Sequence, residues 1–369
     1  MAEADPRERP GVGLRGARSA AARRSAIRAV ANALSVDIDW RPELPELGVK
    51  RTCRQLRGMA PQAGTTTITF QSSTYSDFRQ LLAREAATGM VAVRANLGFP
   101  EEAKDRYPAA VIVHTIAGYR EANEGYAAAE LRKSGFATLT YDSFGARETT
   151  GLRMSGSPGF LPAGVADAYA ALQLLASEPR IDVNRIAIVG FSFGGEVAHL
   201  AAFESLRSAL IPGPGRFAAH VAFYPAGNFG AIAEPDAYTG SPVLMLLGEK
   251  DDNLPVAKVE SYLAYTHATG NPAPIETVIY PGAYHAWTVP SLANLRFYSE
   301  YVSTKKCPLI LLGPKRPVFL IDGEAKPFDP SSFGACMGEA PGYSMAYDAT
   351  VRAQSIADAV RFLQRNLQP

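Results

Sequence analysis

A six-residue stretch at residues 190–195, Gly-Phe-Ser-Phe-Gly-Gly, constrains the fold more than any other part of this sequence. It directly follows an apolar run at residues 185–189 and directly precedes a stretch with helical spacing at residues 196–206. A Gly-x-Ser-x-Gly pattern between a strand and a helix is typical of a nucleophile elbow, a turn that exposes the serine above the sheet. The glycines allow strand and helix to approach closely. The alternative is a tight turn with an incidental serine, since the chain has 32 glycines.

The rest of the chain alternates between strand-like and helix-like segments, which predicts a mostly parallel, doubly wound sheet with helices on both faces. Ligands of such sheets bind outside the carboxyl ends of the strands. Two opening strands are expected to be antiparallel, and six compact apolar runs predict strands buried on both faces. The expected strands are residues 66–70 and 90–97, then 109–114, 137–141, 185–189, 220–223, 243–247 and 276–280. The expected helices are residues 121–134, 164–177, 196–206, 255–267 and a C-terminal helix with an apolar face over 356–367.

The two ends of this pattern fit it poorly and define the expected domain organisation. Residues 1–34 carry seven Arg against three acidic residues, so residues 1–62 are interpreted as a disordered or non-native extension. Residues 63–369 are expected to form one catalytic domain, with a Pro-rich and Gly-rich insertion at about 288–343 that contains one strand-like run, 309–312. No signal peptide is recognisable, which predicts a cytoplasmic protein, and export stays open if translation starts elsewhere.

Composition excludes several classes of function. A formal net charge of +1 argues against nucleic acid as a partner, and the absence of an apolar run of about 18 residues argues against a membrane span. Cys53, Cys307 and Cys336 show no C-x-x-C spacing, so neither a metal site nor a thiol nucleophile is expected. Cys307 and Cys336 could form a disulfide in an exported protein and would be reduced in a cytosol. The sequence gives no indication of the oligomeric state.

A serine nucleophile needs a base and an orienting acid, which follow it in the order acid, then histidine, in folds with this elbow. His285 lies on the loop after the strand at 276–280, whereas His267 falls at a helix end and His114 lies too early in the chain. The acid should lie on the loop at 248–255, where the spacing favours Asp251 and keeps Asp252 in reserve. The same acidic loop could instead cap the following helix.

Stabilisation of an oxyanion requires two backbone N–H groups aimed at the developing charge. The residue after the serine, Phe193, is the first expected donor. The second should come from the loop after the strand at 109–114, and Ile116 is the choice there.

Several motifs occur in the order found in the dienelactone hydrolase family of α/β hydrolases, which this chain resembles over residues 65–290 and the final helix. They are Pro-Ala-Ala-Val-Ile-Val-His-Thr-Ile-Ala-Gly from Pro108, Tyr-Asp-Ser-Phe-Gly-Ala-Arg from Tyr141, the elbow, Gly-Glu-Lys-Asp-Asp from Gly248 and Tyr-Pro-Gly-Ala-Tyr-His-Ala-Trp from Tyr280. The resemblance implies an α/β-hydrolase fold, with Ser192, Asp251 and His285 as a triad and Ile116 and Phe193 as oxyanion donors.

The chain departs from the founding members of that family at two linked positions. Those members have a cysteine where this chain has Ser192, and a glutamate where it has Thr115. In those members the glutamate interacts with the resting thiol. A serine nucleophile forms no thiolate, so the loss of the glutamate is consistent with the loss of the cysteine. Arg147 lies near the family's carboxylate-binding arginine, and it and Tyr119 are candidates for substrate binding. For Arg147, a salt bridge with Glu148 or with a nearby helix is the alternative.

These observations predict a serine hydrolase that cleaves a small carboxylic ester or a lactone through an acyl-enzyme and needs no cofactor. An amidase or peptidase with the same triad is one alternative, because the motifs do not separate esters from amides. A non-catalytic binding module with the α/β-hydrolase fold is another. Such relatives usually lack a triad member, whereas this sequence offers a candidate for each.

Overall fold

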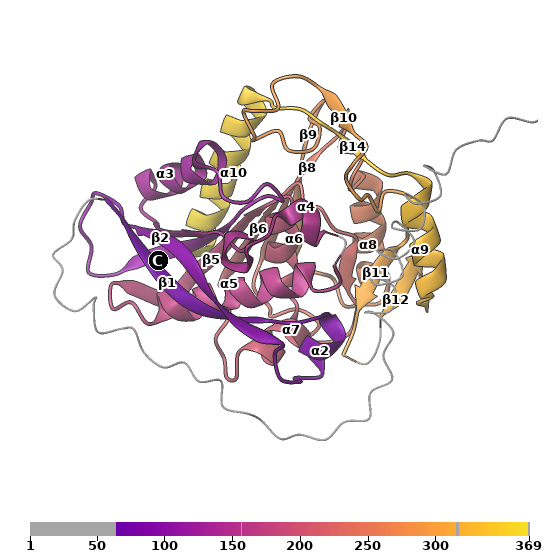
Figure 1. Cartoon of the computed structure of the whole chain (residues 1–369), viewed down its shortest axis with the longest axis horizontal. Coiled ribbons are helices and arrows are strands. Elements are labelled where there is room, and N and C mark those ends of the chain that lie inside the picture. Colours follow the sequence, from indigo (N-terminus) through magenta and orange to yellow (C-terminus); the bar gives the residue numbers. More distant parts are fainter. Residues whose placement is uncertain (1–63, 156, 315–316, 368–369) are drawn as a thin grey trace, which may run out of the picture.

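The core of the protein is an eight-stranded sheet. The computed structural model describes residues 64–155, 157–314 and 317–367. The strands of the sheet lie in the order β1-β2-β4-β3-β5-β6-β8-β9 (Figure 1). All eight strands predicted from the sequence are present, each extended by a few residues at most at either end. They are β1 (Thr65–Thr74), β2 (Gly89–Gly98), β3 (Tyr107–Val113), β4 (Ala137–Tyr141), β5 (Ile181–Phe191), β6 (Ala219–Phe223), β8 (Val243–Gly248) and β9 (Ile275–Tyr280).

Strand directions match the expectation of a mostly parallel sheet. β1 pairs with β2 and β2 with β4 in the antiparallel sense, and every pair from β4 to β9 is parallel. The prediction that the later strands are buried on both faces is confirmed for β3, β4, β6 and β8, in which every residue is buried. It is wrong for β9, where only Tyr280 is buried, because β9 is the last strand of the sheet and has a neighbour on one side only.

Helices cover both faces of the sheet (Figure 1). On one face, α3 and α10 pack on the side chains of one set of alternate strand residues, such as Ile112 and Val189. On the other face, α5, α6 and α7 pack on the opposite set, such as Val111 and Ile188, and α8 packs beside them. These helices are α3 (Tyr126–Lys133), α5 (Phe160–Ala176), α6 (Phe193–Leu200), α7 (Glu204–Leu210), α8 (Val256–Ala268) and α10 (Ala349–Leu367).

Two of the predicted helices differ in detail from the structure. The segment predicted as a helix over residues 121–134 begins with a π-helical turn, Glu121–Gly125, before α3. The segment predicted over residues 196–206 begins earlier, at Phe193, and is broken after Leu200 before α7 resumes. Three short helical segments were not predicted: α2 (Phe78–Leu82), a 3-10 turn (Gly145–Arg147) and α4 (Gly151–Met154).

The insertion after β9 has more regular structure than its sequence indicated. The predicted strand at 309–312 is β11 (Leu309–Leu312), which pairs in parallel with β7 (Phe229–Ala231) and antiparallel with β12 (Val318–Ile321). A further strand, β13 (Glu324–Pro327), completes this four-stranded sheet. The insertion also contains α9 (Pro330–Glu339) and β10 (Arg296–Tyr298), and β10 pairs with β14 (Tyr343–Met345). Four strands and a helix were therefore missed.

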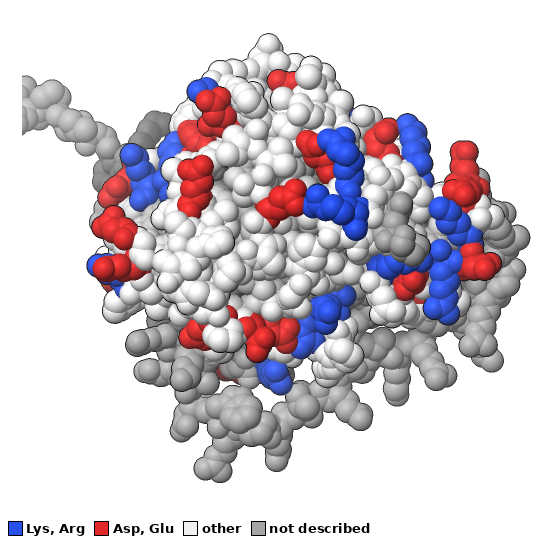
Figure 2. Space-filling view, turned by 180° about the vertical axis from the view of Figure 1, so that it is seen from behind, with Lys and Arg blue, Asp and Glu red and all other residues white. Residues whose placement is uncertain are grey.

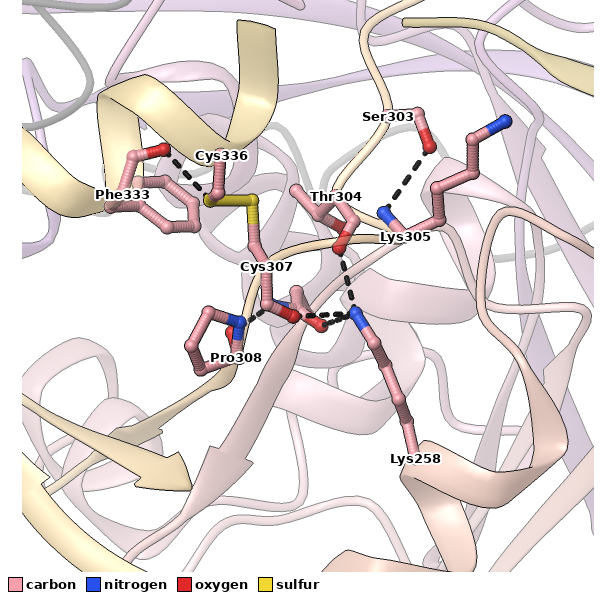
Figure 3. Close-up of a disulfide and its surroundings, with 9 residues drawn as sticks. Lys258, Ser303, Thr304, Lys305, Cys307, Pro308, Phe333 and Cys336 are labelled. Carbon is pink, nitrogen blue, oxygen red and sulfur yellow. Dashed lines mark hydrogen bonds between the residues drawn. A yellow bond between two sulfur atoms is a disulfide. The ribbon is translucent and has the colours of Figure 1, made fainter. Parts of the chain in front are cut away.

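Cys307 and Cys336 form the disulfide that the sequence analysis considered, and it joins the start of β11 to α9 (Figure 3). Beside it, the Lys258 ammonium on α8 donates hydrogen bonds to the carbonyl oxygens of Thr304 and Cys307, at 2.7 and 2.6 Å. The disulfide thus links two parts of the insertion to each other, and the half-buried Lys258 joins the insertion to α8 of the core.

Residues 1–62, predicted to be a disordered or non-native extension, lie outside the described residues, as does Cys53. Within the described part of the chain, no helix combines the length and the apolar character needed to cross a bilayer. On the face drawn in Figure 2, positive and negative side chains are interspersed among wide uncharged areas.

Candidate active site

Ser192 occupies a sharp turn between the end of β5 and the start of α6. Its backbone has φ 54° and ψ −110°, a conformation that non-glycine residues rarely adopt and that is held here by the surrounding structure. A Cβ atom at position 190 would lie 1.8 Å from the Gly194 carbonyl oxygen, and one at position 194 would lie 2.2 Å from the Val113 oxygen. Both positions therefore require glycine, as the sequence predicted.

A continuous hydrogen-bonded chain joins Ser192, His285 and Asp251, which come from three separate loops at the carboxyl edge of the sheet. Ser192 Oγ lies 2.9 Å from His285 Nε2, and His285 Nδ1 lies 2.8 Å from Asp251 Oδ2. A carboxylate only accepts hydrogen bonds, so it fixes the proton on Nδ1 and leaves Nε2 free to accept the serine proton. All three side chains are nearly inaccessible to solvent, at 3%, 1% and 4% exposure.

The loop after β8 orients Asp251 through its own backbone. Asp251 Oδ1 accepts hydrogen bonds from the N–H groups of Asn253 and Leu254, at 2.9 and 3.4 Å, while Oδ2 faces the histidine. The reserve acid Asp252 points elsewhere: it accepts from Lys305 Nζ at 3.2 Å and from the Ser344 N–H at 2.8 Å. The structure therefore selects Asp251 as the partner of His285 and gives Asp252 a role in holding the insertion.

The insertion also holds the loop that carries His285. The N–H of Ala346, just after β14, donates to the His285 carbonyl oxygen at 3.2 Å. The imidazole lies edge-to-face between the rings of Tyr343, at 4.9 Å between centroids, and Tyr224, at 5.1 Å. Neither tyrosine was singled out in the sequence, because no local pattern marks a residue that packs on a distant loop.

The loop after β3 brings Ile116 to the same pocket as Ser192 and Phe193. In this loop the N–H of Thr115 donates to Glu124 Oε1 at 3.0 Å and that of Arg120 to Oε2 at 2.8 Å, whereas the Ile116 N–H has no acceptor among the described residues. The N–H of Phe193 begins α6 and so has no intrahelical acceptor. Glu124, fully buried, is a residue that the sequence analysis missed.

His114 was expected to pack at the end of β3 rather than to act as a base, and the structure confirms this. Its Nδ1 lies 2.7 Å from the Thr115 carbonyl oxygen, and its Nε2 accepts from the Ser143 N–H at 3.0 Å. Both ring nitrogens of His114 therefore already have hydrogen-bond partners.

The two residues predicted to contact substrate, Arg147 and Tyr119, are not among the described residues that line the pocket at Ser192. The Arg147 guanidinium forms two hydrogen bonds with the Asp167 carboxylate of α5, at 2.8 and 2.9 Å, and its side chain is 8% exposed. This is the salt bridge with a nearby helix that the sequence left as the alternative. Tyr119 donates to Glu121 at 2.5 Å and lines a separate polar pocket with Arg94 and Asp142.

A buried polar cluster lies one helical turn beyond Ser192. Glu196 is 1% exposed, and burial raises the pKa of its carboxyl group to about 8. His199 Nδ1 lies 3.9 Å from Glu196 Oε1, but burial and the neighbouring His220 lower the pKa of His199 to about 3. Both shifts favour the uncharged form of each group at neutral pH, which argues against an ion pair between them.

The pocket that opens at Ser192 has a volume of about 160 Å³ and predominantly apolar walls. One wall comes from the core, including Phe160 and Phe229, and the other comes from the insertion, including Phe333 and Met337.

No group of three or more His, Cys, Asp or Glu residues in the described part of the chain is arranged to hold a metal ion. The arrangement at Ser192 can activate a hydroxyl nucleophile beside an uncharged binding pocket.

Comparisons with solved structures find several matches. A dienelactone hydrolase-like promiscuous phosphotriesterase from metagenomic libraries matches 82% of this chain and 98% of its own, at 18% sequence identity and a TM-score of 0.52, which shows a shared fold. A putative dienelactone hydrolase from Klebsiella pneumoniae matches 61% of this chain and 90% of its own, at 21% identity and a TM-score of 0.43. An esterase from Thermogutta terrifontis, phosphorylated by paraoxon, matches 53% and 80%, at 15% identity and a TM-score of 0.40.

No curated protein matches the chain. The model of the dienelactone hydrolase family matches residues 93–307, which include the elbow and both loops that face it. Because this match spans more than half of the 369 residues, the chain belongs to the dienelactone hydrolase family and is an α/β hydrolase that acts on esters.

Proposed function

We propose that this enzyme cleaves a carboxylic ester or a lactone with Ser192 as nucleophile, His285 as general base and acid, and Asp251 as the residue that orients the imidazole. The observation that carries the proposal is the unbroken chain of hydrogen bonds from Ser192 Oγ through His285 to Asp251, at 2.9 and 2.8 Å. Each link has the geometry that a nucleophile, a base and an orienting acid need.

In the first half of the reaction, Ser192 Oγ attacks the carbonyl carbon while its proton moves to His285 Nε2. The tetrahedral intermediate collapses, and His285 gives that proton to the departing alkoxide, which leaves as an alcohol. Water then attacks the acyl-enzyme, His285 takes one of its protons, and the ester bond to Ser192 breaks as that proton returns to Oγ. The carboxylic acid product leaves the enzyme in its starting state.

Two backbone N–H groups supply the stabilisation of the oxyanion in this proposal, those of Ile116 and Phe193. Support comes from their position in the pocket beside Ser192 and from the unoccupied N–H of Ile116. The buried Glu124 carboxylate acts as a positioning residue, because it fixes the peptides on both sides of this loop segment. Loss of a single oxyanion donor typically costs about 10²–10³ in kcat.

The test is covalent labelling with a fluorophosphonate probe, which reacts only with an activated serine. The native protein should be labelled, and Ser192→Ala should not be. Ser208→Ala, a half-buried serine on α7, is the matched control and should be labelled like the native protein. Labelling of folded Ser192→Ala at the native rate, or none of the native protein, would refute the proposed nucleophile.

A second measurement separates esters from amides. Hydrolysis of p-nitrophenyl esters should exceed hydrolysis of peptide p-nitroanilides by several orders of magnitude if the enzyme is an esterase. Comparable rates on both would favour the amidase or peptidase alternative with the same three residues.

The Cys307–Cys336 disulfide supports the export alternative over the cytoplasmic expectation, because such bonds persist in oxidising compartments. Titration of free thiols in unfolded protein that was isolated without reductant checks this. Retention of the bond in protein from the secreted fraction agrees with export, and three free thiols would contradict it.

A further inference from the structure

The pocket beside Ser192 offers no charged group to a substrate. Among the described residues that line it there is no Asp, Glu, Lys, Arg or His, and its polar groups are hydroxyls and amides such as those of Thr304, Asn228 and Asn253. Burying a carboxylate or an ammonium among such groups without a partner is costly. The walls therefore favour a substrate group that carries no charge.

Three cations of the core and the insertion, Lys258, Lys305 and Arg147, are already engaged in hydrogen bonds. Lys258 is bonded to Asn228 Oδ1 and to two carbonyl oxygens of the insertion, and Figure 3 shows its ammonium turned toward Thr304 and Cys307. Lys305 is bonded to Asp252 and to the Gly342 carbonyl oxygen. Arg147 is paired with Asp167 in the interior. None of these three cations could pair with a substrate carboxylate without losing a contact it already has.

The insertion builds the outer wall of the pocket and is fastened at that wall. Phe333 and Met337 lie one turn apart on α9, and both face the pocket. Cys336 lies between them, and its disulfide with Cys307 ties α9 to the segment that contributes Thr304 (Figure 3). The disulfide thus holds the two parts of this outer wall, α9 and the segment at Thr304, against each other.

The volume of about 160 Å³ sets the size of the group that fits. An apolar protein cavity of about 150 Å³ holds one benzene molecule. The pocket therefore has room for a phenyl ring or an aliphatic chain of about six carbons. Phe333 and Met337 of α9 are among the residues that bound this space.

We propose that the substrate is an ester with one bulky, uncharged, apolar group of about the size of a phenyl ring or a hexyl chain, and that Met337 and Phe333 on α9 limit its length. This inference rests on the proposed esterase function of Ser192 and adds the substrate class. It places the selectivity of the enzyme in the insertion rather than in a cation that recognises a carboxylate.

The first test compares matched substrates on the native enzyme. Burial of each added methylene corresponds to about a fourfold gain in kcat/KM, so p-nitrophenyl hexanoate should be cleaved at least ~10-fold more efficiently than the acetate. Mono-p-nitrophenyl adipate has the same six-carbon chain with a terminal carboxylate, and it should be cleaved about 100-fold less efficiently than the hexanoate. A parallel series of methyl, hexyl and benzyl acetates reports whether the alcohol half of the ester occupies the pocket instead.

A rise with apolar size in either series supports the proposal and identifies which half of the ester lies in the pocket. Flat profiles in both series overturn it. If the acyl series is the one that rises with size, equal cleavage of the adipate and the hexanoate overturns it as well. If Ser192-dependent labelling persists while these profiles are flat, the substrate class fails and the proposed function stands. If labelling itself is absent, the proposed function fails.

Variants of α9 test the wall. Met337→Trp should lower the ratio of kcat/KM for hexanoate to that for acetate by about 10-fold, because the indole fills part of the pocket. Met337→Ala should move the preferred chain toward the octanoate. Met90→Ala, which removes a methionine that is 56% exposed on β2, is the matched control and should leave the ratio unchanged. Native-like ratios in folded variants at position 337 overturn the assignment of the wall.

Discussion

The buried carboxyl group of Glu196 makes a prediction whose size can be worked out from the structure. Glu196 follows Ser192 by one helical turn, is 1% exposed, and has one carboxyl oxygen, Oε1, without a hydrogen-bond partner among the described residues. Its side chain packs so closely on Gly227, a residue of the pocket, that a Cβ there would lie 2.0 Å from the Glu196 Cδ. Burial raises the pKa of Glu196 from 4.5 to about 8.

The sign of the pH dependence follows from this pKa. Below pH 4.5 the carboxyl group carries its proton in both the folded and the unfolded chain. Its titration therefore does not change the free energy of unfolding in that range. Between 4.5 and about 8 the unfolded chain has lost the proton while the folded protein keeps it, so stability falls as the pH rises. At about 1.4 kcal/mol per pH unit, the full loss is at most about 5 kcal/mol.

Glu196→Gln removes this titration while keeping the shape of the side chain. The free energy of unfolding of the variant minus that of the native protein should therefore rise steadily with pH. Urea unfolding of both proteins at about pH 5, 6, 7 and 8 measures this difference. His199 and His220, whose pKa values burial lowers to about 3 and 4, stay neutral in the folded protein over this range, so their effects cancel between the two proteins. A difference that stays constant within about 0.5 kcal/mol from pH 5 to 8, or that falls, refutes the reasoning.

Three further predictions test the triad, the elbow and the insertion. Asp251→Asn should lower kcat for an ester about 10³–10⁴-fold, while Asp252→Asn should change it by less than about tenfold, in steady-state assays. Gly190→Ala should destabilise the protein by more than about 4 kcal/mol, seen as loss of soluble protein or a lower urea midpoint, because its Cβ would lie 1.8 Å from a carbonyl oxygen. Replacing Cys307 and Cys336 by serine opens a loop with a sequence separation of 29 and should cost about 3.6 kcal/mol in urea unfolding, and an unchanged midpoint would contradict this.

The parts of this molecule that could be predicted from the sequence are those fixed by local pattern and chain order. Buried parallel strands appear as continuous apolar runs, so the central strands were found where the structure has them. The choice of His285 and Asp251 used the rule that these residues follow Ser192 on loops at the carboxyl edge of the sheet, together with the spacing within the loop at 248–255. The structure brings the three side chains into contact.

The parts that could not be predicted depend on contacts between segments far apart in the sequence. Arg147 pairs with Asp167, twenty residues away on α5, and nothing near Arg147 in the sequence indicates this partner. The small sheet of the insertion includes β7, which lies about eighty residues before β11. No local sequence pattern therefore indicates which strands pair with β11. The position of β9 at the edge of the sheet, which leaves most of its residues partly exposed, likewise depends on the arrangement of the whole sheet.

Adjacent residues on one loop connect the triad to the insertion. Asp251 holds His285, and the next residue, Asp252, holds the Ser344 N–H and Lys305 of the insertion. The chain after Ser344 returns to the triad, because the Ala346 N–H is bonded to the His285 carbonyl oxygen. A displacement of the insertion would therefore pull on both ends of the Asp251–His285 pair. For this reason the insertion is better regarded as part of the catalytic domain than as a separate cap, and changes that loosen it should lower kcat as well as alter substrate selectivity.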